Sequence, residues 1–156
     1  MSALLDVKKG LNKKVKMISD GGIKFSGDIA KALAAGADAV MVGSMLAGTS
    51  EAPGKIIKKK GKLFKVFRGM GSVGAMNKGS ADRYFQKKQK DKSKYVPEGV
   101  EGLIKYKGDV SKTINKLVGG LRSSMGYLGA EQIKYLNKKA KFVKITKAGF
   151  YESMVH

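Results

Sequence analysis

The alternation of short apolar and helical segments in the first third of the chain limits the folds open to it. Residues 15–19 form a short β-prone segment, residues 28–35 place apolar side chains on one helical face, and residues 39–42 form a continuous apolar run. Ser26 suits a helix N-cap, and Gly36 suits a helix stop. Strand, helix and strand in so short a span predict a βαβ unit with parallel strands, the second buried on both faces.

The rest of the chain contains further segments with helical or strand periodicity. These predict helices at residues 2–10 (N-capped by Ser2), 110–121 and 132–139, a hairpin of strands 55–60 and 63–68, and a strand at 142–146. Between the hairpin and the helix predicted at residues 110–121, a glycine-rich stretch at residues 69–79 leads into residues 80–108, which are polar and poorly periodic. A segment of that kind predicts a long loop or flap.

Lysine dominates a strongly basic composition. The formal net charge at pH 7 is +20, and the only arginines are Arg68, Arg83 and Arg122. So large a charge is typical of proteins that bind nucleic acid or anionic surfaces. Scattered lysines with few arginines are more typical of a solvated surface. The composition favours the solvated surface and leaves open a non-catalytic basic module that binds nucleotides or nucleic acid.

Several classes of site are excluded by residues that the chain lacks. It has no cysteine, so a disulfide, a zinc–thiolate site and a thiol nucleophile are excluded. Its only histidine is His156, and neither a Ser–His–Asp triad nor a cluster with metal-ligand spacing can be assembled. Residues 1–10 do not resemble a secretory leader, and the longest apolar stretch, residues 37–48, is too short to span a bilayer. We therefore expect a cytoplasmic protein.

Glycine and small polar residues follow both strands of the predicted βαβ unit. Asp20, Gly21 and Gly22 come after the first strand, and Gly43 and Ser44 after the second. Ligands of parallel α/β folds bind at this edge, where glycine lets a phosphate approach backbone amides. A helix beginning at Ser44 would direct its positive end at that phosphate, and Asp20 could bind ribose hydroxyls. The pattern fits a nucleoside monophosphate site and, equally, ordinary turn glycines.

Two other motifs concern the glycine-rich stretch and the predicted flap. Residues 69–74, Gly-Met-Gly-Ser-Val-Gly, match the dinucleotide pattern G-x-G-x-x-G. That pattern requires a long helix next, and Asn-Lys-Gly-Ser at residues 77–80 interrupts one, so we reject it and keep an anion-binding loop as an option. Arg83 and Tyr84 stand side by side in the flap, where they could contact an anion or transfer a proton; a lone Arg is more often a surface charge.

Several long motifs, in order along the chain, resemble those of the IMP dehydrogenase family. Residues 20–37 and 42–49 resemble the phosphate-binding end of that family's barrel, which GMP reductases share in outline. Four later segments resemble IMP dehydrogenases specifically: Arg68-Gly-Met-Gly-Ser, Asp82-Arg-Tyr-Phe-Gln, Val96-Pro-Glu-Gly-Val-Glu-Gly and Leu117-Val-Gly-Gly-Leu-Arg-Ser-Ser-Met-Gly-Tyr. The resemblance covers nearly the whole chain, and its flap motif argues against the alternative of GMP reductase.

The resemblance implies an α/β fold that is the C-terminal portion of a TIM (β/α)8 barrel, its last two parallel strands, with an inserted hairpin and flap. One partial domain is expected over residues 1–156: barrel units to about residue 50, the hairpin and flap at 51–109, and helices and tail at 110–156. A complete barrel takes roughly 250 residues. We therefore expect a fragment without the family's catalytic-cysteine loop, which exposes apolar surface and is inactive in isolation.

The resemblance also implies the reaction and its participants. The family oxidises IMP to XMP with NAD⁺ in guanine nucleotide biosynthesis: a cysteine attacks C2 of the purine, hydride leaves to NAD⁺, and water hydrolyses the intermediate. Arg83, helped by Tyr84, would activate that water. The implied cofactors are NAD and a potassium ion, and the complete enzyme would be a homotetramer without membrane contact.

The family's binding residues carry over to this sequence by position. IMP would be bound by Asp20, Gly21, Gly22, Gly43, Ser44, Phe67, Arg68, Gly69, Met70, Gly71 and Glu98, and the monovalent cation by Glu152, Ser153 and Met154. Asp20 would hold the ribose, and Glu98 would lie near the base edge. Phe67 stands where the family commonly has Tyr, so one hydroxyl contact to the phosphate is expected to be lost. Met154 replaces a residue that is often His.

Overall fold

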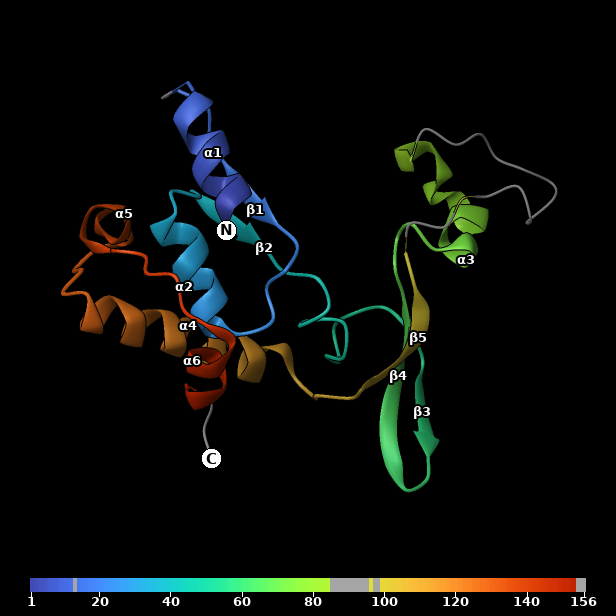
Figure 1. Ribbon diagram of the computed structural model, residues 1–156. Coiled ribbons are helices and arrows are strands. Elements are labelled where there is room, and N and C mark those ends of the chain that lie inside the picture. The colour runs from blue at the N-terminus through green and yellow to red at the C-terminus, as the bar shows by residue number, and fades with distance from the viewer. Residues whose placement is uncertain (13, 85–95, 97–98, 154–156) are drawn as a thin grey trace. The chain divides into compact units, whose positions relative to one another are not determined.

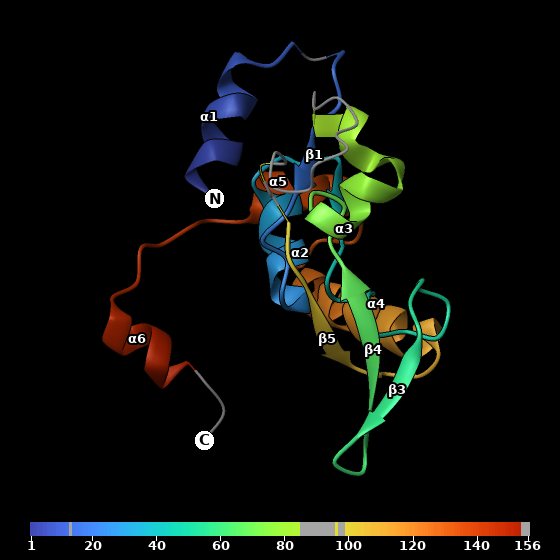
Figure 2. The same cartoon turned by 90° about the vertical axis from the view of Figure 1, so that its right-hand side faces the viewer.

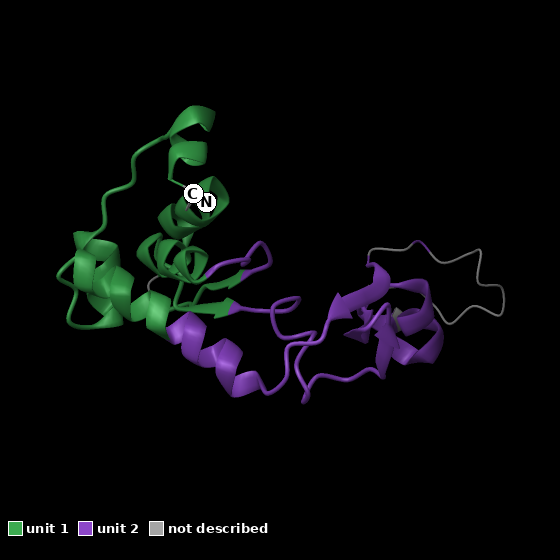
Figure 3. Ribbon diagram, turned by 90° about the horizontal axis from the view of Figure 1, so that it is seen from below, with its two compact units in different colours: residues 1–19, 26–40, 119–156 green, residues 20–25, 41–118 purple. Residues whose placement is uncertain are grey.

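The structure, a computed structural model, describes residues 1–12, 14–84, 96 and 99–153, although not the side chains of Ala81 and Tyr84 (Figures 1 and 2). The described chain is a mixed α/β protein with two sheets, one of strands β1 and β2 and one of strands β3, β4 and β5. It forms two compact units, coloured separately in Figure 3: residues 1–19, 26–40 and 119–156, and residues 20–25 and 41–118.

The predicted βαβ unit is present near the start of the chain. Strand β1 (Ile18–Asp20), helix α2 (Ser26–Ala34) and strand β2 (Ala39–Met41) follow one another, and the two strands are hydrogen-bonded neighbours. The Met17 carbonyl, just before β1, accepts a hydrogen bond from the amide of Asp38, just before β2, at 2.7 Å. Because the strands begin side by side, they run in the same direction, as predicted.

Helix α2 ends where the sequence indicates. The amide of Gly36 donates to the Leu33 carbonyl at 3.0 Å, and the amide of Ala37 donates to the Ala32 carbonyl at 3.1 Å. This pair of bonds is a Schellman motif, with Gly36 at a positive φ of 104°. The apolar face of the helix is buried, as its periodicity predicts: Ile29, Ala30, Ala32, Leu33 and Ala34 are all buried.

A short helix near the C-terminus packs against α2. Helix α5 (Leu136–Lys139), preceded by a 3-10 turn at Ile133–Tyr135, packs on α2. Leu136 is completely buried, which is worth about 1.5–3 kcal/mol in transfer free energy. The Asn137 side chain donates to the Ala34 carbonyl at 3.0 Å. Helix formation predicted at residues 132–139 is therefore confirmed, with its first turn of the 3-10 type.

Helix α4 (Val110–Tyr127) begins where predicted, contains Gly119 and Gly120 in its interior, and extends six residues beyond the predicted end at Leu121. A Cβ built on Gly120 would overlap the Ser26 side chain, so the absent side chain is what allows that close approach. Glycine normally weakens a helix interior by about 1 kcal/mol. Tertiary contact here overrides that local preference.

The second sheet contains the predicted hairpin and one strand that the sequence did not predict. Strands β3 (Ile56–Lys59) and β4 (Lys62–Arg68) pair antiparallel around the turn at Lys60 and Gly61, as expected. Strand β5 (Glu101–Lys105) pairs with the other edge of β4, from Phe64 opposite Lys105 to Arg68 opposite Glu101 (Figure 2). The prediction of a long loop over residues 80–108 is therefore wrong at residues 101–105. The strand there was not predictable locally, because its pairing partner lies more than 30 residues earlier in the chain.

Three other local predictions are wrong. Helix α1 (Ser2–Gly10) is present, but its N-cap is Met1, without a side-chain cap, and Ser2 is already helical. Residues 142–146 form no strand, since no partner strand lies beside them in the described chain, and helix α6 (Lys147–Glu152) follows. Strand β2 is not buried on both faces: Met41 is 50% exposed, because β1 is its only neighbour among the described strands.

Apolar side chains in and next to this first sheet are therefore open to solvent. Ile18 in β1 is 56% exposed, and Phe25, between β1 and α2, is 70% exposed. Among the residues described, no helix combines the length and apolarity needed to cross a bilayer.

Candidate functional site

A cavity of about 770 Å³ lies in the unit formed by residues 20–25 and 41–118. Its size suits a small organic ligand. Its lining comprises Gly43, Ser44, Leu46 and Ala47 after β2, residues 52–55 before β3, residues 66–70 at the end of β4, and Lys78. The cavity thus brings together two glycine-containing segments that the sequence analysis singled out separately.

The charged residues in the lining are all cationic. Lys55, Arg68 and Lys78 line the cavity, and no Asp or Glu among the described residues does. Apolar side chains such as Leu46, Val66 and Phe67 make up much of the remaining surface. A cavity that combines cations, exposed glycine backbone and apolar walls is suited to an organic anion, and a phosphomonoester has that chemistry.

The segment after β2 does not form the helix predicted from Ser44. It is a series of turns instead, in which the Leu46 amide donates to the Gly43 carbonyl and the Thr49 amide to the Leu46 carbonyl, both at 3.0 Å. The Thr49 hydroxyl also donates to the Leu46 carbonyl, at 2.8 Å. A helix dipole therefore does not act at Ser44, and any anion here would depend on local amides and the cationic side chains.

A buried lysine fastens these turns to β4. Lys65 is only 2% exposed, and its Nζ donates to the carbonyl oxygens of Thr49 at 2.5 Å and of Ser50 at 2.8 Å. The backbone beyond is also fixed, because the Ser50 amide donates to the Gly108 carbonyl at 2.8 Å. The two sides of the cavity are joined at this point.

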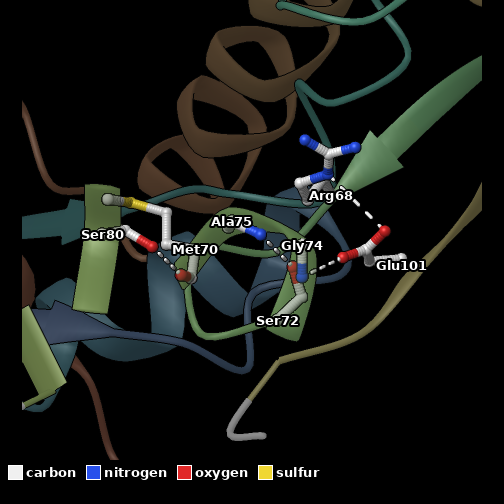
Figure 4. Close-up of polar contacts among 7 residues, drawn as sticks. All are labelled: Arg68, Met70, Ser72, Gly74, Ala75, Ser80 and Glu101. Carbon is white, nitrogen blue, oxygen red and sulfur yellow. Dashed lines mark hydrogen bonds and ion pairs between the residues drawn. The ribbon is translucent and has the colours of Figure 1, made fainter. Parts of the chain in front are cut away.

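Glu101 organises the glycine-rich stretch after β4 (Figure 4). Its Oε1 accepts from the Gly74 amide at 2.7 Å, and its Oε2 lies 3.5 Å from Nε of Arg68. Hydrogen bonds from the Ser72 hydroxyl and then from the Gly74 amide, with a smaller effect of the Arg68 charge, lower the pKa of Glu101. The carboxylate therefore connects β5, the Arg68 side chain and the turn at residues 72–74.

Arg83 lies against the same glycine-rich stretch. Its Nη1 is 3.4 Å from the Met70 sulfur, and the Ser80 hydroxyl donates to the Met70 carbonyl at 2.6 Å (Figure 4 shows the Ser80 bond). Arg83 and Tyr84 belong to a 3-10 helix at Ala81–Tyr84. The structure thus brings the predicted catalytic Arg83 next to the predicted substrate loop, while the Tyr84 side chain lies outside the description.

Helix α3 (Val73–Ala75) has only three residues and leads into a single π-helical segment, Met76–Ser80. The Ser72 hydroxyl caps α3 by accepting from the Ala75 amide at 3.3 Å (Figure 4). A dinucleotide fingerprint needs a long helix at this position. The rejection of that reading for residues 69–74 is confirmed.

Other predicted residues lie apart from the cavity or beyond the description. Asp20 is the last residue of β1, and Gly21 and Gly22 follow it; all three are exposed and, like Gly71, do not line the cavity. Glu98 and Met154 lie outside the described residues. Glu152 and Ser153 are exposed, and the Ser153 hydroxyl donates to the Phe150 carbonyl at 2.7 Å, so these two residues do not by themselves form a cation cage.

Four residues of this region had no predicted role. Lys78 and Lys55 were not distinguished from the other surface lysines. Glu101 was given no role, although it lies in the motif at residues 96–102. Lys65 carried a usable signal, because the alternation of β4 places it on the same face as Leu63 and Phe67. A lysine at an inward position of a strand is unusual and indicates a specific partner.

Comparison with known proteins identifies the family. The whole chain, residues 1–156, matches the domain described as IMP dehydrogenase / GMP reductase domain. The chain belongs to this family. Among similar proteins, inosine-5'-monophosphate dehydrogenase of Bacillus subtilis is 59% identical over 140 residues, which is 90% of this chain and 28% of that protein. The enzyme of the same name from Rhizobium tropici is 53% identical over 150 residues, 96% of this chain and 30% of that protein.

The inosine-5'-monophosphate dehydrogenase of Methanocaldococcus jannaschii is 54% identical over 162 aligned positions, covering 100% of this chain and 32% of that protein. The chain thus spans about 30% of the length of the relatives it matches. Family membership and the name of these relatives agree with the resemblance of the motifs, and they favour IMP dehydrogenase over GMP reductase.

Proposed function

We propose that this chain is the phosphate-binding part of an IMP dehydrogenase and that its cavity holds the 5'-phosphate of IMP. The observation that carries the proposal is the convergence of Gly43 and Ser44 with residues 67–70 in one cation-lined cavity. These segments are far apart in sequence, and both match family motifs. A phosphomonoester dianion would be bound by Arg68 and Lys78 and by the exposed backbone of the glycines.

The complete enzyme would oxidise IMP to XMP with NAD⁺. NAD accepts the hydride, and this chain's own residues would bind the nucleotide and manage water. Arg83 is proposed to activate the hydrolytic water, with Tyr84 beside it, because Arg83 already lies against Met70 of the substrate loop. Asp20 would bind the ribose, and Gly21, Gly22 and Gly71 would approach the phosphate once the site is complete. Glu98 would contact the base.

The proposal includes a specific place for this chain in a (β/α)8 barrel. Strands β1 and β2 would be the last two parallel strands of a (β/α)8 barrel, whose ligands bind at the carboxyl ends of strands. The hairpin and flap would be insertions at residues 51–109, between barrel units at about 1–50 and the helices and tail at 110–156. The exposed Ile18 and Met41 support this, because other barrel strands would cover them.

Potassium and assembly belong to the complete enzyme. Glu152, Ser153 and Met154 are proposed to contribute to a monovalent cation site. Such a site requires several converging oxygen atoms, so other segments or a second subunit would have to provide most of them. A homotetramer would provide such subunits, and the complete enzyme is proposed to act in the cytoplasm.

The proposal is tested by calorimetric titration of the purified chain with IMP and with inosine, which differs by the phosphate. We expect IMP to bind and inosine to bind more weakly. Arg68→Met should weaken IMP binding about tenfold or more, as for a charge-assisted hydrogen bond, and leave inosine binding unchanged. Arg122→Met is the matched control, because Arg122 is exposed in α4 and does not line the cavity.

Two further readouts complete this test. NADH formation with IMP and NAD⁺ should be absent for the chain alone, because the family's nucleophile is a cysteine and this chain has none; turnover would contradict that expectation. Equal affinity for IMP and inosine would refute the phosphate assignment. Steeply salt-dependent binding to random duplex without preference for IMP would instead support a basic nucleic-acid-binding module.

A further inference from the structure

Lys65 connects the two sides of the proposed phosphate cavity without lining it. Val66 and Phe67 follow it directly in β4 and belong to one side of the lining. Its Nζ donates to the carbonyls of Thr49 and Ser50, in the turns after β2, at 2.5 and 2.8 Å. A lysine that is 2% exposed gives up its hydration, so these two bonds replace water around the ammonium group.

Thr49 connects Lys65 to residues that line the cavity. This residue is 1% exposed, and both its amide and its hydroxyl donate to the Leu46 carbonyl, at 3.0 and 2.8 Å. Leu46 and the adjacent Ala47 line the cavity. A displacement of Thr49 would therefore move the wall that also carries Gly43 and Ser44, because the Leu46 amide donates to the Gly43 carbonyl.

We infer that Lys65 is a positioning residue that sets the separation between the two walls of the phosphate cavity, an inference that rests on the proposed function. An ammonium group has three donors, and Lys65 directs two of them at the turn after β2. Without these donors, the carbonyls of Thr49 and Ser50 lose their partner and the turn is no longer held against β4. The walls would then separate, and a phosphate would no longer contact both.

A purely structural role makes a different prediction. If Lys65 only stabilised the fold, its loss would reduce the folded fraction and lower the apparent affinity for every ligand alike. A positioning role changes the contribution of the phosphate alone. The informative quantity is therefore the ratio of inosine to IMP dissociation constants, and not either constant by itself.

The test is a titration of Lys65→Met with IMP and with inosine, after circular dichroism has established that the chain is folded. Methionine keeps an unbranched side chain of similar length but has no donor. Lys62→Met is the matched control, since Lys62 is also in β4 and is exposed. We expect the ratio to fall about tenfold in Lys65→Met, the loss typical of a charge-assisted bond, and to stay at the wild-type value in Lys62→Met.

Lys65→Arg provides a second variant in case Lys65→Met does not fold. Arg keeps the charge and the donors, but its longer, planar head cannot reproduce both bonds at the same reach, so we expect a folded chain with a ratio reduced at least threefold. A folded variant with the wild-type ratio would overturn the inference, and so would failure of both variants to fold, which would assign Lys65 to stability. Absence of phosphate-dependent binding in the wild-type chain would instead refute the proposed function.

Discussion

Replacement of Gly54 by Ala should be costly, and the structure allows the cost to be worked out. Gly54 lines the cavity at a φ of +115°, a conformation that L residues rarely adopt, and a Cβ there would overlap the backbone carbonyl of Val66. The unfavourable φ costs about 1–3 kcal/mol. The overlap is with backbone and cannot be relieved by a side-chain rotation, which adds about 1–3 kcal/mol. We expect Gly54→Ala to lower the free energy of unfolding by about 2–6 kcal/mol.

Gly61→Ala isolates the conformational part of this cost. Gly61 has a φ of +74° in the hairpin turn, and nothing lies within 4 Å of a Cβ built there. Its replacement should cost only the conformational part, about 1–3 kcal/mol. Urea unfolding followed by circular dichroism measures both variants. The reasoning is refuted if Gly54→Ala is no more destabilising than Gly61→Ala, because the predicted overlap with Val66 would then carry no energy.

Two more predictions concern the glycine-rich stretch and the phosphate contact. The pKa of Glu101 is lowered from its ordinary 4.5 by hydrogen bonds from Ser72 and Gly74, so its carboxylate stabilises the fold above pH 4.5 and this contribution is lost as the pH falls through the folded-state pKa. The melting temperature of Glu101→Gln should therefore lie below that of the wild type at pH 7, and the difference should shrink as the pH is lowered. A difference that stays constant with pH would contradict this prediction. Phe67→Tyr should restore a phosphate hydroxyl contact and tighten IMP binding about threefold to tenfold, with inosine binding unchanged in the same titration.

Local sequence signals were sufficient for most of the elements near the start of the chain. The 3.6-residue periodicity of α2, the stop at Gly36 and the apolar run of β2 depend on neighbours within one or two turns of chain. The hairpin of β3 and β4 was also predictable, because Lys60-Gly61 sits between two apolar segments in a two-residue turn. In each case the residues that define the element are the residues that make it up.

The failures have a common physical cause. Strand β5 exists because β4 offers it a free edge, whereas residues 142–146, which are rich in β-branched and aromatic residues, form no strand because no strand of the described chain pairs with them. Helix α4 runs six residues past its predicted end at Leu121, and the contact of its Gly120 with Ser26 joins segments that are far apart in the chain. Pairing and close approach between distant segments are decided by tertiary contacts, which periodicity within one segment does not contain.

The sequence by itself determined the family, the parallel order of β1 and β2, and the two motifs that could bind a phosphate. Only the tertiary structure decided that Gly43 and Ser44 share a cavity with residues 67–70, and that Asp20 lies outside it. It alone gave roles to Lys65 and Glu101, since a buried ammonium or a bridging carboxylate is defined by its partners. Those partners lie about 15 to 30 residues away along the chain, a distance at which neither charge nor periodicity predicts contact.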